Sequence, residues 1–340
     1  MKRKKIIYGI LLLLLLVAGF LGWKVFGPTV SAPDGKYFFI RTGETYSEIK
    51  QSLLDQKIIS SEYFFEFLAK RLKYTKAVKA GRYEIKEGMS IYRLVKMLQL
   101  GNQSPVNLVI TKLRTKEDLA KKIGNSFECD SLDFINILNN DDSLRKYGLD
   151  TNIAMTAVIP NTYSIMWNSS ASRIFKKLSS EKDKFWNEER MKKANALNMT
   201  PDQVYTMASI VDEETNKEED KGNIASVYIN RVRSGQRLEA DPTIKFALRN
   251  FGLKRIRSSH IDAAKASPYN TYFRTGLPPG PICTPSSKTI DAVLNAPSTN
   301  YLFFVARPDW SGLSNFTSSY EQHMINAKNY QRFLDSVNIK

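Results

Sequence analysis

The sequence predicts an α+β protein in which one N-terminal transmembrane helix precedes a small α+β module and a larger mixed α+β domain. Three observations lead to this prediction. An uncharged apolar run lies close to the N-terminus, strand and helix patterns alternate over residues 37–110, and mostly helical patterns with short strand-like runs follow. A chain of 340 residues is long enough for about two such domains.

The N-terminal segment has the composition of a membrane anchor. Four basic residues at positions 2–5 precede an uncharged run from Ile6 to Trp23, which as a helix is about 27 Å long, close to the hydrocarbon thickness of a bilayer. The basic residues place residues 1–5 in the cytoplasm, the anchor at residues 6–26 and the remainder outside the membrane. Residues 30–32 (VSA) can also be interpreted as a signal-peptide cleavage site, but the apolar run is longer than is usual there.

The net charge of +16 favours an anionic partner. Setting the four basic residues at positions 2–5 aside leaves +12 on the exported part, which first meets anionic lipid headgroups and the anionic cell wall. A solvated lysine-rich surface without a partner is the alternative. The sequence contains no zinc-finger or RNA-binding motif, so we expect no nucleic-acid partner.

Cysteine and histidine are scarce and far apart in the sequence: Cys129, Cys283, His260 and His323. This excludes a disulfide-rich scaffold and an iron–sulfur protein, and it argues against a structural zinc site. We expect no metal, no cofactor and no required disulfide, because a core of this size needs no covalent cross-link.

Residues 27–36 are rich in proline, glycine and small side chains and are predicted to be a linker to the module at 37–110. The elements expected in the module are a strand at 37–41, helices at 45–56 and from a cap at Ser60 through Leu68, a strand at 81–85, a helix at 90–100 ended by Gly101, and a strand at 106–110. This outline is similar to LysM-like modules, which hold glycan chains; a spacer without a ligand is the alternative.

The second domain is predicted to cover residues 111–340. Thr115 and Asp118 form an expected capping box, and helical patterns follow at 132–138 and 174–197. Between these two patterns, residues 159–163 read as a turn in a strand-like context.

A helix is predicted from Thr200, with Thr200 as its N-cap and Pro201 in its first turn, to Thr215. Its apolar stripe consists of Val204, Met207, Ala208, Ile210 and Val211. At 100° per residue, Glu214 falls about 50° from the centre of this stripe, Asp212 about 110° and Glu213 about 150°. We therefore expect Asp212 and Glu213 to be solvated or flanking, and Glu214 to face the interior or the floor of a cleft.

A carboxylate pressed against apolar neighbours loses hydration, so its pKa rises. A carboxylic acid that is still protonated near neutral pH can act as a general acid, which makes Glu214 a catalytic candidate. The alternatives are an ion pair between Glu214 and an arginine such as Arg231, or a helix that frays before Glu214.

Polar and aromatic residues downstream can contact sugars. Asp241 precedes a proline, which favours a turn, and five of the 13 prolines lie between residues 267 and 285, around Tyr269, Asn270 and Tyr272. Such a segment is stiff and extended and is predicted to form one wall of a substrate cleft. A rigid loop without a ligand is the alternative.

These motifs together resemble the endolytic murein transglycosylases of the YceG-like (MltG) family, and the resemblance covers nearly the whole chain. The matching strings are AGRYEIKEGMS (80–90), MASIVDEET (207–215), ASVYINRV (225–232), LEADPTIKF (238–246), SPYNTYFRTGLPPGPI (267–282) and YLFFVA (301–306). In this family the second acid of an SI-[VI]-E-x-E-T string is the catalytic glutamate, which implies that role for Glu214.

The resemblance also supplies candidates for the rest of the site. Candidate substrate-binding residues are Asn230, Asp241, Tyr269, Asn270 and Tyr272, and candidate supporting residues are Asp212, Arg231 and His323. Two positions depart from the family pattern. Asp212 stands where a glutamate is usual, and Ser314 stands where a G-x-H-x-F string has its histidine, whereas His323 matches a later histidine.

The implied reaction is cleavage of the MurNAc–GlcNAc β-1,4 bond of peptidoglycan without water, giving 1,6-anhydro-MurNAc ends and terminating nascent strands. The implied partners are glycan strands, the cytoplasmic membrane and peptidoglycan synthases. The alternatives are a non-catalytic glycan-binding scaffold of the synthesis machinery and a glycoside hydrolase with two carboxylates, Glu214 and Asp241. A pyridoxal-phosphate lyase finds no support in the sequence.

Overall fold

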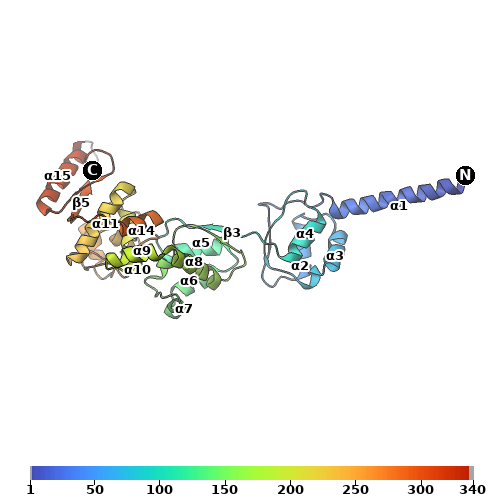
Figure 1. Cartoon of the computed structure of the whole chain (residues 1–340), viewed down its shortest axis with the longest axis horizontal. Coiled ribbons are helices and arrows are strands. Elements are labelled where there is room, and N and C mark those ends of the chain that lie inside the picture. The colour runs from blue at the N-terminus through green and yellow to red at the C-terminus, as the bar shows by residue number, and fades with distance from the viewer. Residues whose placement is uncertain (1, 337–340) are drawn as a thin grey trace. The chain divides into compact units, whose positions relative to one another are not determined.

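The computed structural model describes residues 2–336, and its strands are short (Figure 1). Within these residues six strands of four residues each pair into three two-stranded sheets, and helices make up most of the remainder. The predicted mixed α+β class with an N-terminal apolar helix is confirmed. Contacts between residues divide the chain into two units. The first contains residues up to 108 with 126–129 and 164–170, and the second contains 109–125, 130–163 and the chain from 171 onward.

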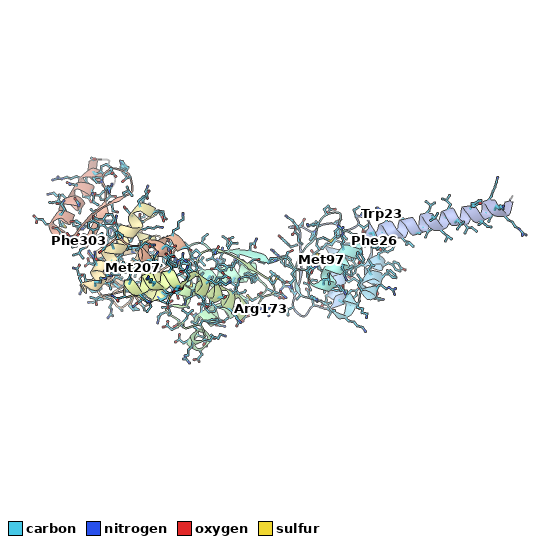
Figure 2. The ribbon with its side chains drawn as sticks, viewed as in Figure 1. Trp23, Phe26, Met97, Arg173, Met207 and Phe303 are labelled. Atoms are coloured by element: carbon cyan, nitrogen blue, oxygen red, sulfur yellow. The ribbon has the colours of Figure 1, made fainter. Side chains whose placement is uncertain are left out.

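Helix α1 (Lys2–Phe26) begins the first unit. Among the described residues it is the one helix long and apolar enough to cross a bilayer, and its apolar stretch is not buried within the protein. Figure 2 labels Trp23 and Phe26 near the end of this helix. The Phe26 ring lies 5.4 Å from the ring of Tyr92 on α4, so the last turn of α1 packs on the module. A single-pass anchor fits these observations.

The core of the first unit lies between one two-stranded antiparallel sheet and three helices. Strand β1 (Tyr37–Ile40) pairs antiparallel with β2 (Gly81–Glu84), with Tyr37 opposite Glu84. The helices are α2 (Tyr46–Asp55), α3 (Glu62–Arg71) and α4 (Ile91–Leu100), with the short 3-10 helix η1 (Tyr74–Lys76). Helices α2 and α4 lie within one residue of their predicted ranges, α3 extends three residues beyond Leu68, and η1 was not predicted.

Two details of this unit differ from the prediction. Helix α3 starts one residue later than expected, with Ser61 rather than Ser60 at the N-cap position, and the Ser61 side chain makes no capping hydrogen bond. Val30, inside the predicted linker, is only 1% exposed, and its backbone bridges to Ile59 and Met89. Val30 is buried because its methyl groups pack in the core and its backbone N–H donates to the carbonyl of Met89.

Strand β3 (Val106–Val109) pairs with β4 (Thr162–Ile165). The helices that follow β3 in the chain are α5 (Lys116–Ser126), α6 (Ser131–Leu138), α7 (Asp141–Arg145), η2 (Ala154–Ala157), α8 (Ala171–Phe185) and α9 (Glu188–Ala196). The capping box at Thr115 is confirmed, since Thr115 and Asp118 exchange two hydrogen bonds of 3.0 Å. The single helix predicted over 174–197 is wrong. It is interrupted at residues 186–187, because the Asn187 side chain accepts a hydrogen bond from the N–H of Arg190 and starts α9.

The central element of the second unit is α10 (Pro201–Glu214), which begins at the predicted cap. The Thr200 side chain accepts from the N–H of Gln203, and the Gln203 side chain accepts from the N–H of Thr200. Residues 204–212 are all buried. The helices that contact α10 are α9, α11 (Glu218–Arg233), α12 (Asp241–Ala247) and α14 (Ser287–Leu294), as Figure 1 shows for α9, α11 and α14.

The remaining elements of the second unit follow α12 and α14. They are α13 (Ser258–Ala263), β5 (Phe303–Ala306), β6 (Ser314–Thr317) and α15 (Tyr320–Ser336). Strands β5 and β6 are antiparallel, with Phe304 opposite Phe316, and α15 packs on this pair. Glu214, as the last residue of α10, thus stands where the buried helix ends.

Candidate active site

Glu214 is held at the end of α10 by a hydrogen bond from α11. The hydroxyl of Tyr228 donates to Glu214 Oε1 at 2.6 Å. Tyr228 is only 2% exposed, and its ring packs edge-on against Phe304 of β5 at 6.0 Å. The helix stops here because Thr215 is extended, with φ −146° and ψ 146°. The carboxyl group therefore has one fixed partner and one open side.

The open side faces a pocket of about 280 Å³. Its lining comes from the ends of α10, α11 and α12, from β5 and α15, and from the loops around them. The lining residues are Glu214, Tyr228, Arg231, Leu238, Glu239, Asp241, Tyr272, Phe303, Phe304 and His323. This volume is just below the range of about 300–1,000 Å³ that encloses a drug-sized ligand. The pocket is therefore suited to holding one part of a larger substrate.

Burial raises the pKa of Glu214 to about 7. The hydrogen bond from Tyr228 works in the opposite direction, since it stabilises the carboxylate, and the negative charge of Asp241 adds to the rise. At neutral pH the protonated and ionised forms are therefore both populated. Such a group can donate a proton in one step and accept one in the next.

Asp241 and Tyr272 also line the pocket. Asp241 is the first residue of α12, and the Tyr272 hydroxyl donates to Asp241 Oδ1 at 2.6 Å. Burial and the neighbouring Asp241 raise the pKa of Tyr272, so it stays a hydrogen-bond donor. Both residues were predicted for this site, and the structure brings them together with Glu214.

Arg231 and His323 also line the pocket, but each is engaged with the protein. Arg231 donates to the Leu302 carbonyl at 2.7 Å and to Glu239 Oε2 at 3.1 Å. The ion pair between Arg231 and Glu214 considered from the sequence is therefore not formed. His323 stacks on Phe303 at 5.2 Å, and burial, with the charge of Arg231, lowers its pKa.

Asp212 and Glu213 were expected to be solvated or flanking, and a solvated position is wrong for both. Side-chain exposure is 7% for Asp212 and 13% for Glu213. The helical-wheel angles assumed a helix with a solvent face, whereas α10 is surrounded by other elements. Angle from the apolar stripe therefore does not separate buried from exposed positions in its last turn.

Asp212 lies in a network of charges next to the active-site helix end. Its carboxylate is 2.8 Å from Lys112 Nζ and 3.3 Å from Lys221 Nζ, and it accepts a hydrogen bond from the Thr289 hydroxyl. Burial alone would raise the pKa of Asp212, but these hydrogen bonds and charges hold it below its usual value. Glu213 pairs with Arg114 at 3.0 Å and with Lys112 at 3.4 Å. The two acids fasten the end of α10 to the segment at 112–114.

Three predicted binding residues lie elsewhere. Of the described residues that line the pocket, none is Asn230, Tyr269 or Asn270. The Asn230 amide donates to the carbonyls of Thr299 and Tyr301, and the Asn270 amide donates to the carbonyl of Ile261. These asparagines shape loops, and Tyr269 faces another depression, described below.

Sequence reasoning missed several pocket residues: Tyr228, Leu238, Glu239, Phe303 and Phe304. All five lie inside strings used to identify the family, but no spacing rule singles out Tyr228, fourteen positions after Glu214 on another helix. Glu239 has φ +54°, an uncommon left-handed conformation for a glutamate at a pocket wall. Among residues 2–336 no cluster of three or more His, Cys, Asp or Glu side chains could hold a metal ion.

Comparison with known proteins assigns the chain to a family. The model of the YceG-like family matches residues 38–329. The chain belongs to the YceG-like family. The endolytic murein transglycosylase of Bacillus subtilis is 27% identical over 319 residues, which are 88% of this chain and 85% of that relative.

Two further matches agree with membership of the YceG-like family. The endolytic murein transglycosylase of Streptococcus pneumoniae serotype 2 is 28% identical over 299 residues, covering 78% of this chain, and the match spans about half, 53%, of the length of that relative. A crystal structure of a YceG-like protein from Listeria monocytogenes has a TM-score of 0.56 and 26% identity, covering 86% of this chain and 99% of that one. The family and the enzyme class, lytic transglycosylase, identified from the sequence are thus confirmed.

The Asp212 network leads to a prediction about stability. Asp212→Asn removes the charge between two lysines, one of them only 5% exposed, so we expect the free energy of unfolding to fall by about 1–3 kcal/mol. Because the pKa of Asp212 is held below 3.8, the wild-type advantage is present above that pH and is lost as the pH falls further. Urea unfolding at pH 7 and at pH 3 measures both effects.

Glu213→Gln is the matched control for this prediction. The arginine partner of Glu213 is 39% exposed, and exposed pairs contribute about 0–1 kcal/mol. A variant Asp212→Asn at least as stable as Glu213→Gln would contradict the structural role of the network.

Proposed function

We propose that this chain is a membrane-anchored lytic transglycosylase that cleaves the MurNAc–GlcNAc β-1,4 bond inside peptidoglycan strands and leaves 1,6-anhydro-MurNAc ends. The observation that carries the proposal is Glu214, a carboxyl group with a pKa of about 7 at the wall of an open pocket. The relatives are named endolytic murein transglycosylases, which supports murein as the substrate and a transglycosylase reaction.

The reaction needs only one carboxyl group. Protonated Glu214 gives its proton to the glycosidic oxygen while the bond from that oxygen to C1 of MurNAc breaks. The C6 hydroxyl oxygen of the same sugar then attacks C1, and its proton passes to the Glu214 carboxylate. The enzyme is restored, no water is consumed, and the products are an anhydro end and a free 4-hydroxyl.

The neighbours of Glu214 suit both steps. The Tyr228 hydroxyl stabilises the carboxylate formed after the first proton transfer, at 2.6 Å. Asp241, held by Tyr272 in the pocket, places negative charge near the sugar, where positive charge develops at C1. We infer that Asp241 and Tyr272 orient the sugar, and that Arg231 and His323 support the wall behind it.

Asp241 also supports a second candidate, a glycoside hydrolase with Glu214 as acid and Asp241 as the second carboxylate. The products separate the two. A hydrolase leaves reducing MurNAc ends, a lytic transglycosylase leaves anhydro ends, and a glycan-binding scaffold leaves the strand intact.

The organisation of the chain completes the proposal. We infer that residues 37–110 are a LysM-like module, that residues 111–340 are the catalytic domain, and that α1 keeps both outside the cytoplasmic membrane. A helix that holds the enzyme close to the membrane would bring it to newly made strands. This supports a role in terminating nascent strands, with peptidoglycan synthases as partners.

Glu214→Gln tests the chemistry. The amide keeps the shape of the side chain but cannot donate the proton, so we expect release of anhydro-muropeptides to fall by about 10²–10⁴-fold with strand binding largely retained. Digestion of purified peptidoglycan followed by mass spectrometry gives the rate and the kind of end. The control Glu213→Gln changes the adjacent residue, which lies outside the pocket. Assayed at a temperature where this variant is folded, it should still release anhydro-muropeptides. Anhydro ends at near wild-type rate from Glu214→Gln would overturn the assignment.

Tyr228→Phe tests the hydrogen bond to Glu214. The wild-type rate should fall as the pH rises through about 7, because the general acid must be protonated. Loss of the Tyr228 donor destabilises the carboxylate and raises the pKa of Glu214 further, so the alkaline limb of kcat/KM should move to higher pH. A limb that stays in place, or moves to lower pH, would show that the hydrogen bond does not set this pKa.

Membrane topology is tested by adding protease to intact protoplasts or spheroplasts. We expect the chain beyond the anchor to be degraded and an N-terminal tag to stay protected, because the basic residues at positions 2–5 hold that end in the cytoplasm. A soluble protein that begins after residue 32 would instead show that the segment at 30–32 is cleaved.

A further inference from the structure

Tyr269 belongs to the SPYNTY segment yet does not line the Glu214 pocket, which raises the question of what it faces. It lines a separate depression of about 190 Å³, which shares Arg114 with a larger neighbouring one of about 550 Å³. Both depressions lie in the second unit. Their basic side chains are Lys112, Arg114, Lys116, Lys121, Lys122 and Arg249. We call these residues, with Tyr269, Phe246 and Phe251, the basic–aromatic surface.

The three aromatic rings form a continuous strip across this surface. The ring of Phe246 lies 4.6 Å from that of Tyr269 and 6.4 Å from that of Phe251. Arg249 lies over Phe246 and Arg114 lies over Phe251, each 5.1 Å from the ring centroid. A guanidinium group stacked on an aromatic ring can still donate from its edge, as Arg114 does to Glu213 and Arg249 does to Glu117.

The charges of the surface are unbalanced. Among the described residues that line the two depressions, Asp118 is the one acid, against six cations. Asp212 and Glu213 neutralise Lys112 and Arg114 from beneath. Arg249 pairs with Glu117 at 3.4 Å. Lys116, Lys121 and Lys122 remain, and the loop that carries Phe251 continues with three more basic residues, Lys254, Arg255 and Arg257. Cations gathered in a concave region favour an anionic ligand, because it relieves their mutual repulsion.

Two segments of the chain contribute both to this surface and to the Glu214 pocket or to its immediate neighbours. Glu213, which pairs with Lys112 and Arg114, is the residue before Glu214. Helix α12 begins with Asp241 in the pocket and carries Phe246 of the aromatic strip five residues later. A substrate held at Glu214 that also carries an anionic branch can therefore reach both.

We propose that the basic–aromatic surface binds the peptide stem of the glycan strand that is cleaved at Glu214. Peptide stems carry free carboxylates, which suit Lys121 and Lys122, and short apolar side chains, which suit the aromatic strip. An anionic phosphate polymer would use the cations but has no apolar groups for the rings. The inference rests on the proposed function and adds a determinant of substrate choice to it.

The test compares strands with intact stems and strands stripped of stems by an amidase. For the full-length wild-type chain, we expect kcat/KM to be about tenfold higher on intact strands, corresponding to about 1.4 kcal/mol, and the ratio to shrink at high salt. In the double variant Lys121→Glu/Lys122→Glu the ratio should fall towards one, and Lys121→Arg/Lys122→Arg should preserve it. The matched control Lys192→Glu/Lys288→Glu, two exposed lysines on α9 and α14, should leave it unchanged.

The outcomes separate this inference from the proposed function. Equal rates on the two kinds of strand, or a ratio that Lys121→Glu/Lys122→Glu leaves unchanged, would overturn the inference while the cleavage stands. Competition by inorganic polyphosphate without any effect of removing the stems would overturn it in favour of a phosphate polymer. If the wild type released no anhydro ends, the proposed function would fail. Binding of intact and stripped strands by Glu214→Gln would then still decide whether the surface recognises stems.

Discussion

The hydrogen bond from Tyr228 to Glu214 is the interaction on which the site depends. It joins the last residue of α10 to a buried position on α11, so the carboxyl group stays in place only while those two helices hold their relative position. Asp212 and Glu213 provide this constraint on the other side of the helix end, through Lys112, Lys221, Thr289 and Arg114. The three consecutive acidic residues at positions 212–214 thus have different roles. Two fasten the end of the helix, and the third faces the pocket.

Asp212 and Glu214 show how far surroundings decide the state of a carboxyl group. Both are in the last turn of one helix and both lose water on folding, which raises the pKa of each. Asp212 is compensated by two lysines and a hydroxyl, so its pKa ends below the usual value. Glu214 has one tyrosine and a nearby carboxylate, so its pKa ends near 7. A fixed anion and a proton donor arise two residues apart because the compensating partners are distributed unequally.

Local elements were predictable from the sequence because their signals are local. The cap at Thr200, the capping box at Thr115 and the end of a helix at Gly101 each depend on residues within a few positions of one another. The position of Glu214 at a pocket was also predictable, although for an incomplete reason. The wheel assumed one apolar face, whereas α10 is buried on all sides, so the same reasoning misplaced Asp212 and Glu213.

Partners that come from distant parts of the chain could not be predicted in this way. The pocket gains Tyr228, Phe303 and Glu239 only when α11, β5 and the loop before α12 pack together. No periodicity in the sequence predicts these contacts. Asn230 and Asn270 show the reverse case. Their polar side chains in a sugar-binding context suggested ligand contact, but their amides satisfy carbonyl groups of loops. A buried loop carbonyl needs a donor as much as a sugar hydroxyl does, so residue type alone cannot distinguish the two roles.

The two departures from the family pattern lie outside the pocket, which limits their effect on the chemistry. Asp212 is shorter than glutamate by one methylene, yet it still reaches Lys112, Lys221 and Thr289, so the end of α10 remains fastened. Ser314 is in β6, where its backbone N–H donates to the buried carboxylate of Asp220 at 2.6 Å, and any residue other than proline can supply that bond. The proton of Glu214 is controlled by burial, Tyr228 and Asp241, and neither departure alters any of these. A catalytic group whose pKa depends on its immediate contacts can therefore tolerate changes in the residues that hold the surrounding elements, as long as those residues still bind their partners.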